Sequence, residues 1–300
     1  MNRHGILLAI VLAFVASAAS AEEKNLNKTF TVTPGGMITV DADRADITVT
    51  GGNTNTVVVR IEARGSQSEL DELKLSAEPS SDGIKVEALR PAQRGWFKWG
   101  SWRVETHIDV TVPRSYRVDA KTSGGDVRLD DVSGPSRLRT SGGDVQARNV
   151  RGAFEGHTSG GDVRIDSMEG SVSAHTSGGD VTLSGIKGDV DANTSGGDVR
   201  LTRVDGKINA GTSGGDVRCE LLGANRGVSA RTSGGSVYLT LPKDITGTLD
   251  AESSGGHIDS DLPISTTRWS EHRLNGQING GGNEIFVRTS GGSITLTAAR

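Results

Sequence analysis

The chain has 300 residues, of which 42 are glycine and only 4% are aromatic. This composition excludes one thick core of large apolar side chains, and glycine does not recur at every third residue as collagen requires. The 33 basic and 37 acidic residues nearly balance, with a pI of about 5.9, which argues against sequence-independent nucleic-acid binding.

The N-terminus has the pattern of a secretory signal peptide. The short basic Asn2-Arg3-His4 precedes an apolar run from Gly5 to Ala18, and Ala19-Ser20-Ala21 has the small-x-small form of a cleavage site. The run is short for a membrane span, and no later stretch reaches 18 apolar residues. We therefore predict that residues 1–21 are removed near Ala21. The mature chain would lack a transmembrane segment and reside in the periplasm or at the cell surface.

The following part, residues 22–121, is strand-rich but irregular. Alternating apolar residues predict strands over residues 37–40, 47–49, 57–61, 84–88 and 104–112, the last ended by Pro113. The one helix candidate is residues 68–73, where Ser66 with Glu69, or Ser68 with Asp71, could form a capping box. No flexible linker separates this part from the next, so we expect irregular coils that continue directly into residues 122–300.

Residues 95–103 form the most chemically distinctive irregular segment. Three of the chain's four tryptophans lie there within seven positions, beside lysine and arginine. One interpretation is a cap over the end of the fold, and the other is a contact loop for a glycan, a membrane face or a protein. The candidate contact residues are Trp96, Phe97, Lys98, Trp99 and Trp102. Trp102 adjoins a strand and favours packing, whereas Trp96 and Trp99 favour contact.

From Thr122 onward the sequence is a repeat. Thr-Ser-Gly-Gly begins six times at intervals of 18 residues, from Thr122 to Thr212. Later copies begin at Thr232, Ser253 and Thr289, with a decayed copy at residues 274–278 between the last two. Each unit holds two short strands of period-2 apolar residues, which cannot be stable alone but can stack on identical neighbours. The sequence therefore predicts an all-β fold, a parallel β-solenoid of about 18-residue coils with one short helix.

The repeat also predicts which residues point inward. Equivalent positions form four apolar columns and a flanking set of alanines: Val127, Val145, Val163, Val181, Val199, Val217; Leu129, Ala147, Ile165, Leu183, Leu201, Cys219; Val132, Val150, Met168, Ile186, Val204, Leu222; Phe154, Val172, Val190, Ile208, Val228; Ala174, Ala192, Ala210. The single cysteine, Cys219, falls in one column, so we expect a small buried apolar side chain rather than a reactive thiol.

The aspartate that follows each Gly-Gly pair is the first candidate ligand. One Gly-Gly-Asp per coil lacks the paired nonapeptides of calcium-binding β-rolls. We expect the glycines to supply a turn with positive φ and the carboxylates to accept turn N–H groups. The column is Asp126, Asp144, Asp162, Asp180, Asp198 and Asp216, flanked by Arg128, Arg164, Arg200 and Arg218. Weak cation binding along this column stays open as an alternative.

Other chemistry finds less support in the sequence. The threonine column lacks the Thr-x-Thr pairs of ice-binding faces, because its partner position is aspartate. His157 and His175 are one coil apart, which allows a metal pair, but exposed strand-end histidines are the simpler interpretation. The coils from Thr122 to Arg231 have no long insertion that could build a catalytic cleft, and no catalytic sequence motif is present. No catalytic, cofactor-binding or metal-binding residue is therefore predicted.

Several of these segments together resemble the bacterial "putative adhesin" domain of unknown function, also called the toastrack domain. They are residues 30–36, residues 108–113, the Gly-Asp-Val repeats and the ending at residues 280–294. The resemblance covers nearly the whole mature chain. It implies a cell-envelope β-solenoid, linked in some members to envelope stress and to assembly scaffolds, and it carries no catalytic residues.

The sequence thus favours an exported, non-enzymatic adhesin-like or scaffold protein that presents a solenoid surface in the cell envelope. Its partner would be an envelope protein or a glycan, and its oligomeric state is left open. A calcium- or metal-dependent binding module is the second hypothesis. A glycan-active β-helix enzyme is the third, and it would need a deep acid-lined cleft.

Overall fold

The computed structural model describes residues 22–90 and 103–299. The chain divides into two compact units, residues 1–146 and residues 147–300. The predicted signal peptide, residues 1–21, lies outside the described residues.

The first unit is built of strands and one short helix. Its elements are β1 (Glu22–Thr31), β2 (Met37–Ala42), β3 (Ala45–Gly52), β4 (Thr56–Gly65), α1 (Gln67–Glu72), β5 (Lys74–Ser80), β6 (Gly83–Leu89), β7 (Glu105–Pro113), β8 (Arg117–Thr122), β9 (Val127–Asp130) and β10 (Ser136–Arg139). All five strands predicted here are confirmed, as β2, β3, β4, β6 and β7. The sequence analysis missed β1, β5 and β8, in which charged and polar residues outnumber apolar ones.

The predicted helix is confirmed as α1, but neither proposed capping box forms. Ser66 is the N-cap residue, and its side chain makes no capping hydrogen bond to the backbone. Its hydroxyl instead donates to Glu69 Oε2 at 2.7 Å. The far end of α1 is held from β1, where Lys24 Nζ donates to the carbonyl oxygens of Leu70 and Leu73 at 2.8 and 2.6 Å. A cation at the last carbonyls of a helix is favourable, because the helix dipole is negative there.

Within the first unit the strands form two series, in the orders β1-β4-β7-β3-β9 and β5-β6-β2-β8-β10. The chain order is not the stacking order. Strand β2 pairs in parallel with β6 on one side and with β8 on the other. Likewise β3 pairs in parallel with β7 and β9. The coil formed by β2 and β3 therefore lies between two coils that come later in the sequence.

The second unit contains the remaining strands. They are β11 (Val145–Arg151), which carries the boundary between the units, β12 (Phe154–His157), β13 (Val163–Glu169), β14 (Val172–His175), β15 (Val181–Lys187), β16 (Val190–Asn193), β17 (Val199–Asp205), β18 (Ile208–Gly211), β19 (Val217–Leu221), β20 (Val228–Thr232), β21 (Val237–Leu241), β22 (Gly247–Ser253), β23 (Ile258–Ser260), β24 (Ile264–Ser270), β25 (Arg273–Ile278), β26 (Glu284–Thr289) and β27 (Ile294–Ala298).

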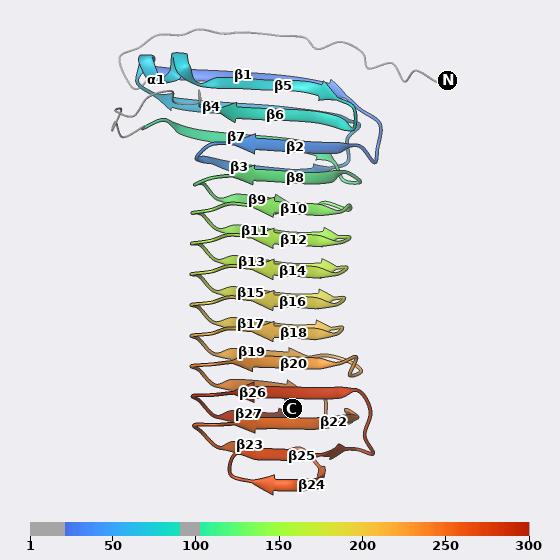
Figure 1. Ribbon diagram of the computed structural model, residues 1–300. Helices are drawn as coiled ribbons and strands as arrows, with labels where there is room; N and C mark the ends of the chain where they lie inside the picture. Colours follow the sequence, from blue (N-terminus) through green and yellow to red (C-terminus); the bar gives the residue numbers. More distant parts are fainter. Residues whose placement is uncertain (1–21, 91–102, 300) are drawn as a thin grey trace. The chain divides into compact units, whose positions relative to one another are not determined.

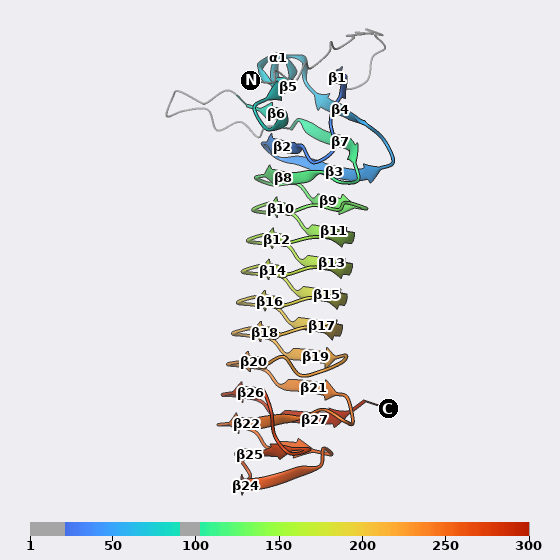
Figure 2. The ribbon, with the colours of Figure 1, turned by 90° about the vertical axis from the view of Figure 1, so that its right-hand side faces the viewer.

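In the second unit each regular coil gives one strand to each of two sheets (Figure 2). We call the sheet that contains β13, β15 and β17 sheet A and the one that contains β14, β16 and β18 sheet B. Neighbouring coils pair in parallel and in register, so that Val181 faces Val199 across sheet A and Val190 faces Ile208 across sheet B. The predicted parallel β-solenoid with 18-residue coils is confirmed.

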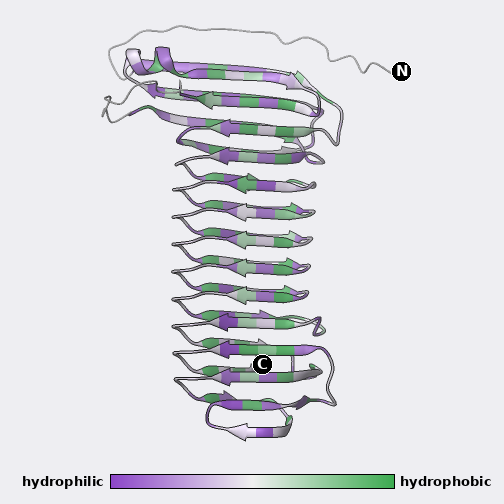
Figure 3. Ribbon diagram, viewed as in Figure 1, coloured by the Kyte–Doolittle hydropathy of each residue, from purple (hydrophilic) through white to green (hydrophobic). Residues whose placement is uncertain are grey.

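The predicted apolar columns are buried, with one exception. Hydrophobic and hydrophilic residues alternate along the strands (Figure 3), and Val181, Leu183 and Ile186 are fully buried. Leu222 was assigned to the third column but is 42% exposed. Leu221 takes its place opposite Val204, because the ladder between β17 and β19 shifts register by one residue. The shift falls where the repeat loosens, because the interval from Thr212 to the next copy at Thr232 is 20 residues instead of 18.

A left-handed residue in five successive coils explains why the apolar spacing there changes from two to three. Val145 and Ala147 point inward, and strict alternation would then bring Asn149 inward. Asn149 instead has a φ of 54°, and Val150 is buried. The equivalent residues in other coils also have positive φ; they are Asp131, Ser167, Gly185 and Arg203. Because neighbouring coils share this residue, their register is unchanged, and the extra position restores the inward direction of the next apolar side chain.

The C-terminal coil is inserted out of chain order. Strand β26 pairs in parallel with β20 on one side and with β22 on the other. Strand β27 pairs likewise with β21 and β23. The copy that begins at Thr289 therefore lies between the copies that begin at Thr232 and Ser253 (Figure 1). The decayed copy is strand β25, which runs antiparallel to β22 and to the edge strand β24.

Candidate functional site

The Thr-Ser-Gly-Gly-Asp corner is held by a ladder of buried threonine hydroxyls. Thr194 Oγ1 donates to the carbonyl oxygen of Gly179, one coil back, at 2.7 Å. Thr194 Oγ1 in turn accepts the N–H of Gly197 at 3.4 Å. Thr176, Thr212 and Thr232 repeat the donor contact. These hydroxyls are turned into the fold, so these threonines form no water-ordering face.

The aspartate column forms a second ladder at the same corner. The N–H of Asp198 donates to Asp180 Oδ1 at 2.8 Å, and Asp198 Oδ1 accepts the N–H of Asp216 at 2.8 Å. The second oxygen of Asp216 contacts Arg218 Nη2, also at 2.8 Å. One carboxylate oxygen of each of these residues is thus committed to the backbone of the next coil. This agrees with the predicted N–H acceptor role and leaves fewer oxygens for a cation.

The reason for the Gly-Gly pair differs from the prediction. Gly178 and Gly179 do not have positive φ, so the expected left-handed turn is wrong at these positions. The cause is the close approach of the coils. A methyl group at Gly179 would overlap the carbonyl oxygen of Gly161 and the carboxylate of Asp162, whereas one at Gly178 would meet the Gly160 carbonyl oxygen at 3.3 Å. The second glycine is therefore the stricter requirement.

The surroundings of the cysteine and of the two histidines do not indicate a reactive thiol or a metal site. Cys219 is buried, and burial raises the pKa of its thiol to about 12, so the thiolate is scarce at neutral pH. His157 and His175 are register partners on β12 and β14. His175 Nε2 lies 2.8 Å from the Ser173 hydroxyl. Among residues 22–90 and 103–299, no group of three or more His, Cys, Asp or Glu side chains could hold a metal ion.

The five predicted contact residues, Trp96, Phe97, Lys98, Trp99 and Trp102, lie outside the described residues. The fourth tryptophan, which the sequence analysis left aside, lies on the edge strand β24. Trp269 is 62% exposed, and it is the most exposed large apolar side chain in the described part of the chain. Six of the seven residues of β24 are exposed. An exposed aromatic side chain on an edge strand is a candidate contact for a partner.

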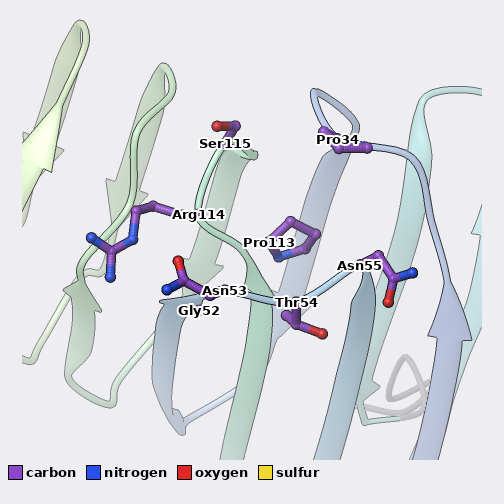
Figure 4. A pocket seen from close by; sticks show the side chains of 8 residues that line it. All are labelled: Pro34, Gly52, Asn53, Thr54, Asn55, Pro113, Arg114 and Ser115. Carbon is purple, nitrogen blue, oxygen red and sulfur yellow. The ribbon is translucent and has the colours of Figure 1, made fainter.

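The first unit contains an open hollow of about 540 Å³ (Figure 4). It is lined by Pro34, by residues 52–55 and by residues 113–115. Its only ionisable side chain is that of Arg114, and the loops around it are joined by backbone hydrogen bonds such as Gly35 N–H to Ser115 O at 2.7 Å. This hollow brings together no pair of acidic or nucleophilic side chains.

A cluster of arginines around one phenylalanine lies on the outer face of sheet B. We call it the Phe286 cluster, and it consists of Arg231, Glu252, Arg273, Phe286 and Arg288. The Arg231 guanidinium carbon lies 4.6 Å from the centre of the Phe286 ring, and that of Arg288 lies 5.1 Å from it. Stacking of this kind orients both guanidinium groups on one half-buried ring.

Glu252 neutralises part of this cluster. Its Oε2 contacts Arg273 Nη2 at 2.7 Å and also contacts Arg288 Nη2. The hydrogen bond from Arg273 is the largest cause that lowers the pKa of Glu252 below its ordinary value, so the carboxylate stays charged at neutral pH. Arg231 has no carboxylate partner in the described part of the chain. The cluster thus carries three positive charges against one negative charge, and Arg231 is an exposed guanidinium group beside the aromatic ring.

The fold and these surfaces define a β-solenoid whose coils present ordered columns of polar and charged side chains. The chain belongs to the family described as Toastrack DUF4097, whose family model matches residues 36–297. The resemblance drawn from the sequence motifs is thereby confirmed. No curated protein matched the chain.

Three solved structures align with most of this chain at low sequence identity. A "putative cell adhesion protein" from Clostridium sporogenes is 13% identical, with 93% of this chain and 100% of that chain covered and a TM-score of 0.24. A "putative adhesin" from Bacteroides fragilis is 14% identical over 91% and 97% of the two chains, with a TM-score of 0.41. A "putative lipid binding protein" from Parabacteroides distasonis is 11% identical over 92% and 97%, with a TM-score of 0.49.

Within the described part of the chain, no helix has the length and apolar character that a membrane crossing requires.

Proposed function

We propose that this protein is an exported, non-enzymatic adhesin-like or scaffold protein that presents its solenoid surface to a partner in the cell envelope. The observation that carries the proposal is the strict division of each coil. Apolar side chains fill the interior, while the outer faces carry polar and charged residues at fixed intervals along the stack. A repeated surface of this kind suits extended contact with a polymer or a protein. Export rests on the signal-peptide pattern of residues 1–21, and a connection with envelope stress is part of the same proposal.

We propose two regions of contact. The first is the predicted tryptophan segment, with Trp96 and Trp99 as contact residues and Trp102 as a packing residue. The second is the Phe286 cluster, where Arg231 is exposed and uncompensated. Tryptophan and arginine are enriched among residues that dominate binding energy. The partner classes are an envelope protein and an acidic glycan, because Arg231 favours a carboxylate or sulfate group.

The calcium-dependent alternative has less support than the scaffold role. In the aspartate ladder one oxygen of Asp180 and one of Asp198 already accept backbone N–H groups, so a cation would compete with these bonds. If the ladder is structural, EDTA and calcium should leave the melting temperature unchanged. A rise of several degrees with calcium would favour the cation-dependent module instead.

Binding of residues 22–300 to purified envelope fractions and to arrayed acidic glycans tests the proposal. Trp96→Ala and Trp99→Ala should abolish capture and leave the melting temperature unchanged, whereas Trp102→Ala should lower it. Arg231→Ala should weaken capture of acidic glycans. Thr182→Ala, an outward change in a regular coil, is the matched control.

Melting losses at all three tryptophans with capture intact would contradict the contact-loop assignment. Equal capture by Arg231→Ala and the control would contradict the role of the Phe286 cluster.

A further inference from the structure

We propose that the C-terminal coil, strands β26 and β27, can be exchanged between two copies of this chain, so that each copy fills the slot of the other. The slot is the space between the coil of β20 and β21 and the coil of β22 and β23. It is bounded on both sides by strands that come earlier in the chain. A segment at the end of the chain can leave such a slot without unthreading any other strand.

The slot offers the complete pairing of a regular coil. Thr289 Oγ1 donates to the carbonyl oxygen of Gly235 at 2.7 Å, and Ser253 Oγ donates to that of Gly292 at 2.7 Å. These two bonds continue the threonine ladder through the inserted coil on both of its sides. The same bonds form when the inserted coil comes from a second copy, because every donor and acceptor is identical.

The connection to this coil has the properties of a hinge. Residues 279–283 join β25 to β26 and read Asn-Gly-Gly-Gly-Asn. Asn279, Gly280, Gly281 and Gly282 all have positive φ, from 45° to 149°. Nothing lies within 4 Å of the place where a Cβ of Gly280 would be. Glycine gives this segment access to extended conformations as readily as to the observed one. The side-chain hydrogen bonds of the loop lie at its two ends, where Asn279 Nδ2 donates to the carbonyl oxygens of Lys243 and Ile245 at 3.2 and 2.8 Å, and Thr248 Oγ1 donates to that of Gly282 at 3.1 Å. The bonds of Asn279 can stay in place while the backbone at Gly280 and Gly281 changes conformation.

A pair of asparagines holds the base of the hinge. Asn225 Nδ2 donates to the carbonyl oxygen of Asn283 at 2.7 Å, and Asn283 Nδ2 donates to that of Asn225 at 2.8 Å. Asn225 is buried, and its side chain also donates to the carbonyl oxygen of Thr246 at 3.1 Å. This reciprocal bond fixes where the inserted coil begins, and it forms equally well with Asn283 of a second copy.

Exchange would give the Phe286 cluster a composite origin. Phe286 and Arg288 lie on β26, whereas Arg231 lies on β20 and Glu252 on β22. In an exchanged dimer, one copy supplies the ring and Arg288, and the other supplies Arg231, Glu252 and Arg273, which lies on β25. Two such clusters would then be present in each dimer, which doubles the valency of the surface. The exchange itself does not depend on the proposed function, because it rests on the topology and the hinge.

Mixing two variants that each carry one introduced cysteine, with the native Cys219 replaced by alanine in every chain, tests the exchange. Ser229 on β20 and Phe286 on β26 are outward register partners. Ser229→Cys and Phe286→Cys chains, unfolded and refolded together at high concentration, should give a disulfide-linked heterodimer on non-reducing electrophoresis. Asn209→Cys mixed with Ser229→Cys is the matched control, because these register partners lie on β18 and β20, which do not exchange. This control should give no heterodimer.

The double variant Ser229→Cys/Phe286→Cys shows whether this pair of positions can form a disulfide at all. Its two cysteines should link in the monomer. If the double variant links but the mixed single variants remain monomers, exchange is contradicted. Deleting Gly280 and Gly281 should raise the dimer fraction of the full chain, because a short hinge cannot fold back into its own slot. A folded, monomeric deletion variant would also contradict the proposal.

Discussion

The regular coils of residues 147–222 and the coils that follow are built from the same repeat, but they stack by different rules. From β13 to β18 each strand pairs with the strand one coil on, so chain order and stacking order agree. Beyond β21 the last coil lies between two earlier ones. The comparison teaches that the repeat determines how a coil is built, whereas contacts between distant residues determine where the coil is placed.

In the first unit, too, the order in which the coils stack differs from their order in the chain. The coil of β2 and β3 comes first in the chain after β1, yet it pairs with β8 and β9 on one side. Its other side is covered by β6 and β7. In each unit a coil thus lies between coils that are not its nearest neighbours in the sequence.

The largest expected effect concerns the interior of a regular coil. Val181→Asp should lower the free energy of unfolding by more than about 3 kcal/mol, because it places an unpaired charge in a thin apolar core. Val181 is fully buried, and Thr182 beside it points outward between Arg164 and Arg200. Thr182→Asp is therefore the matched control and should be tolerated. Chemical denaturation of both variants checks this, and equal midpoints would overturn the inward assignment.

The next effect concerns the contact between stacked corners. Gly179→Ala should cost up to about 3 kcal/mol, because its methyl group would overlap backbone and a carboxylate of the preceding coil. The nearest atom to a methyl group at Gly178 would be the Gly160 carbonyl oxygen at 3.3 Å, so Gly178→Ala should cost under about 1 kcal/mol. Thermal unfolding of the two variants measures the difference. If Gly178→Ala instead destabilised the protein more than Gly179→Ala, the glycines would be required for their backbone conformation and not for lack of space.

A smaller effect separates the inserted coil from the regular ones. Asn225→Ala should cost about 2 kcal/mol, because it removes a buried side chain that donates to the carbonyl oxygens of Thr246 and Asn283. Hydrogen exchange should accelerate in residues 284–298 and stay slow in residues 181–204. Asn209→Ala, which removes one outward bond to Asp191, is the control. Uniform acceleration along the whole second unit would mean that the inserted coil does not open separately.

The smallest effect is a pH dependence at the Phe286 cluster. The pKa of Glu252 is lowered in the folded state, chiefly by the Arg273 hydrogen bond, so its contribution to stability is complete above the ordinary pKa of 4.5. That contribution is lost as the pH falls through the lowered value. Glu252→Gln should therefore show a smaller fall in melting temperature between pH 7 and pH 3 than the wild type. Glu220→Gln, an outward change on β19, should keep the wild-type fall.

Much of the fold could be predicted from the sequence because an 18-residue repeat shows its own register. The 18-residue period alone identified the buried columns from Val127 to Val217. The equal length of the repeats indicated that neighbouring coils stack in parallel. Leu222 was misplaced because the repeat loosens there, and a one-residue shift reverses the direction of a side chain. The glycines were explained by φ rather than by space, because sequence shows that glycine is required but not whether conformation or crowding requires it.

The order of the terminal coils and the Phe286 cluster could not be predicted, since both depend on contacts between distant residues. Arg231 and Arg288 are 57 residues apart in the chain and become neighbours only because β26 enters beside β20. Phe286 belongs to a segment recognised for its Gly-Gly-Gly-Asn and Thr-Ser-Gly-Gly motifs, which carry no information about stacking order. The asparagines at positions 225 and 283 were the available signal, but isolated asparagines in loops are too common to indicate a pair.

Disulfide trapping within one chain tests the inserted coil most directly. In the structure Ser229 is the register partner of Phe286, and Asp250 lies one strand further on, beyond Phe286. The variant Ser229→Cys/Phe286→Cys should therefore form a disulfide under mild oxidation, and Ser229→Cys/Asp250→Cys should not. If the coils stacked in chain order, Ser229 and Asp250 would be adjacent instead. A disulfide in the second variant and none in the first would contradict the account.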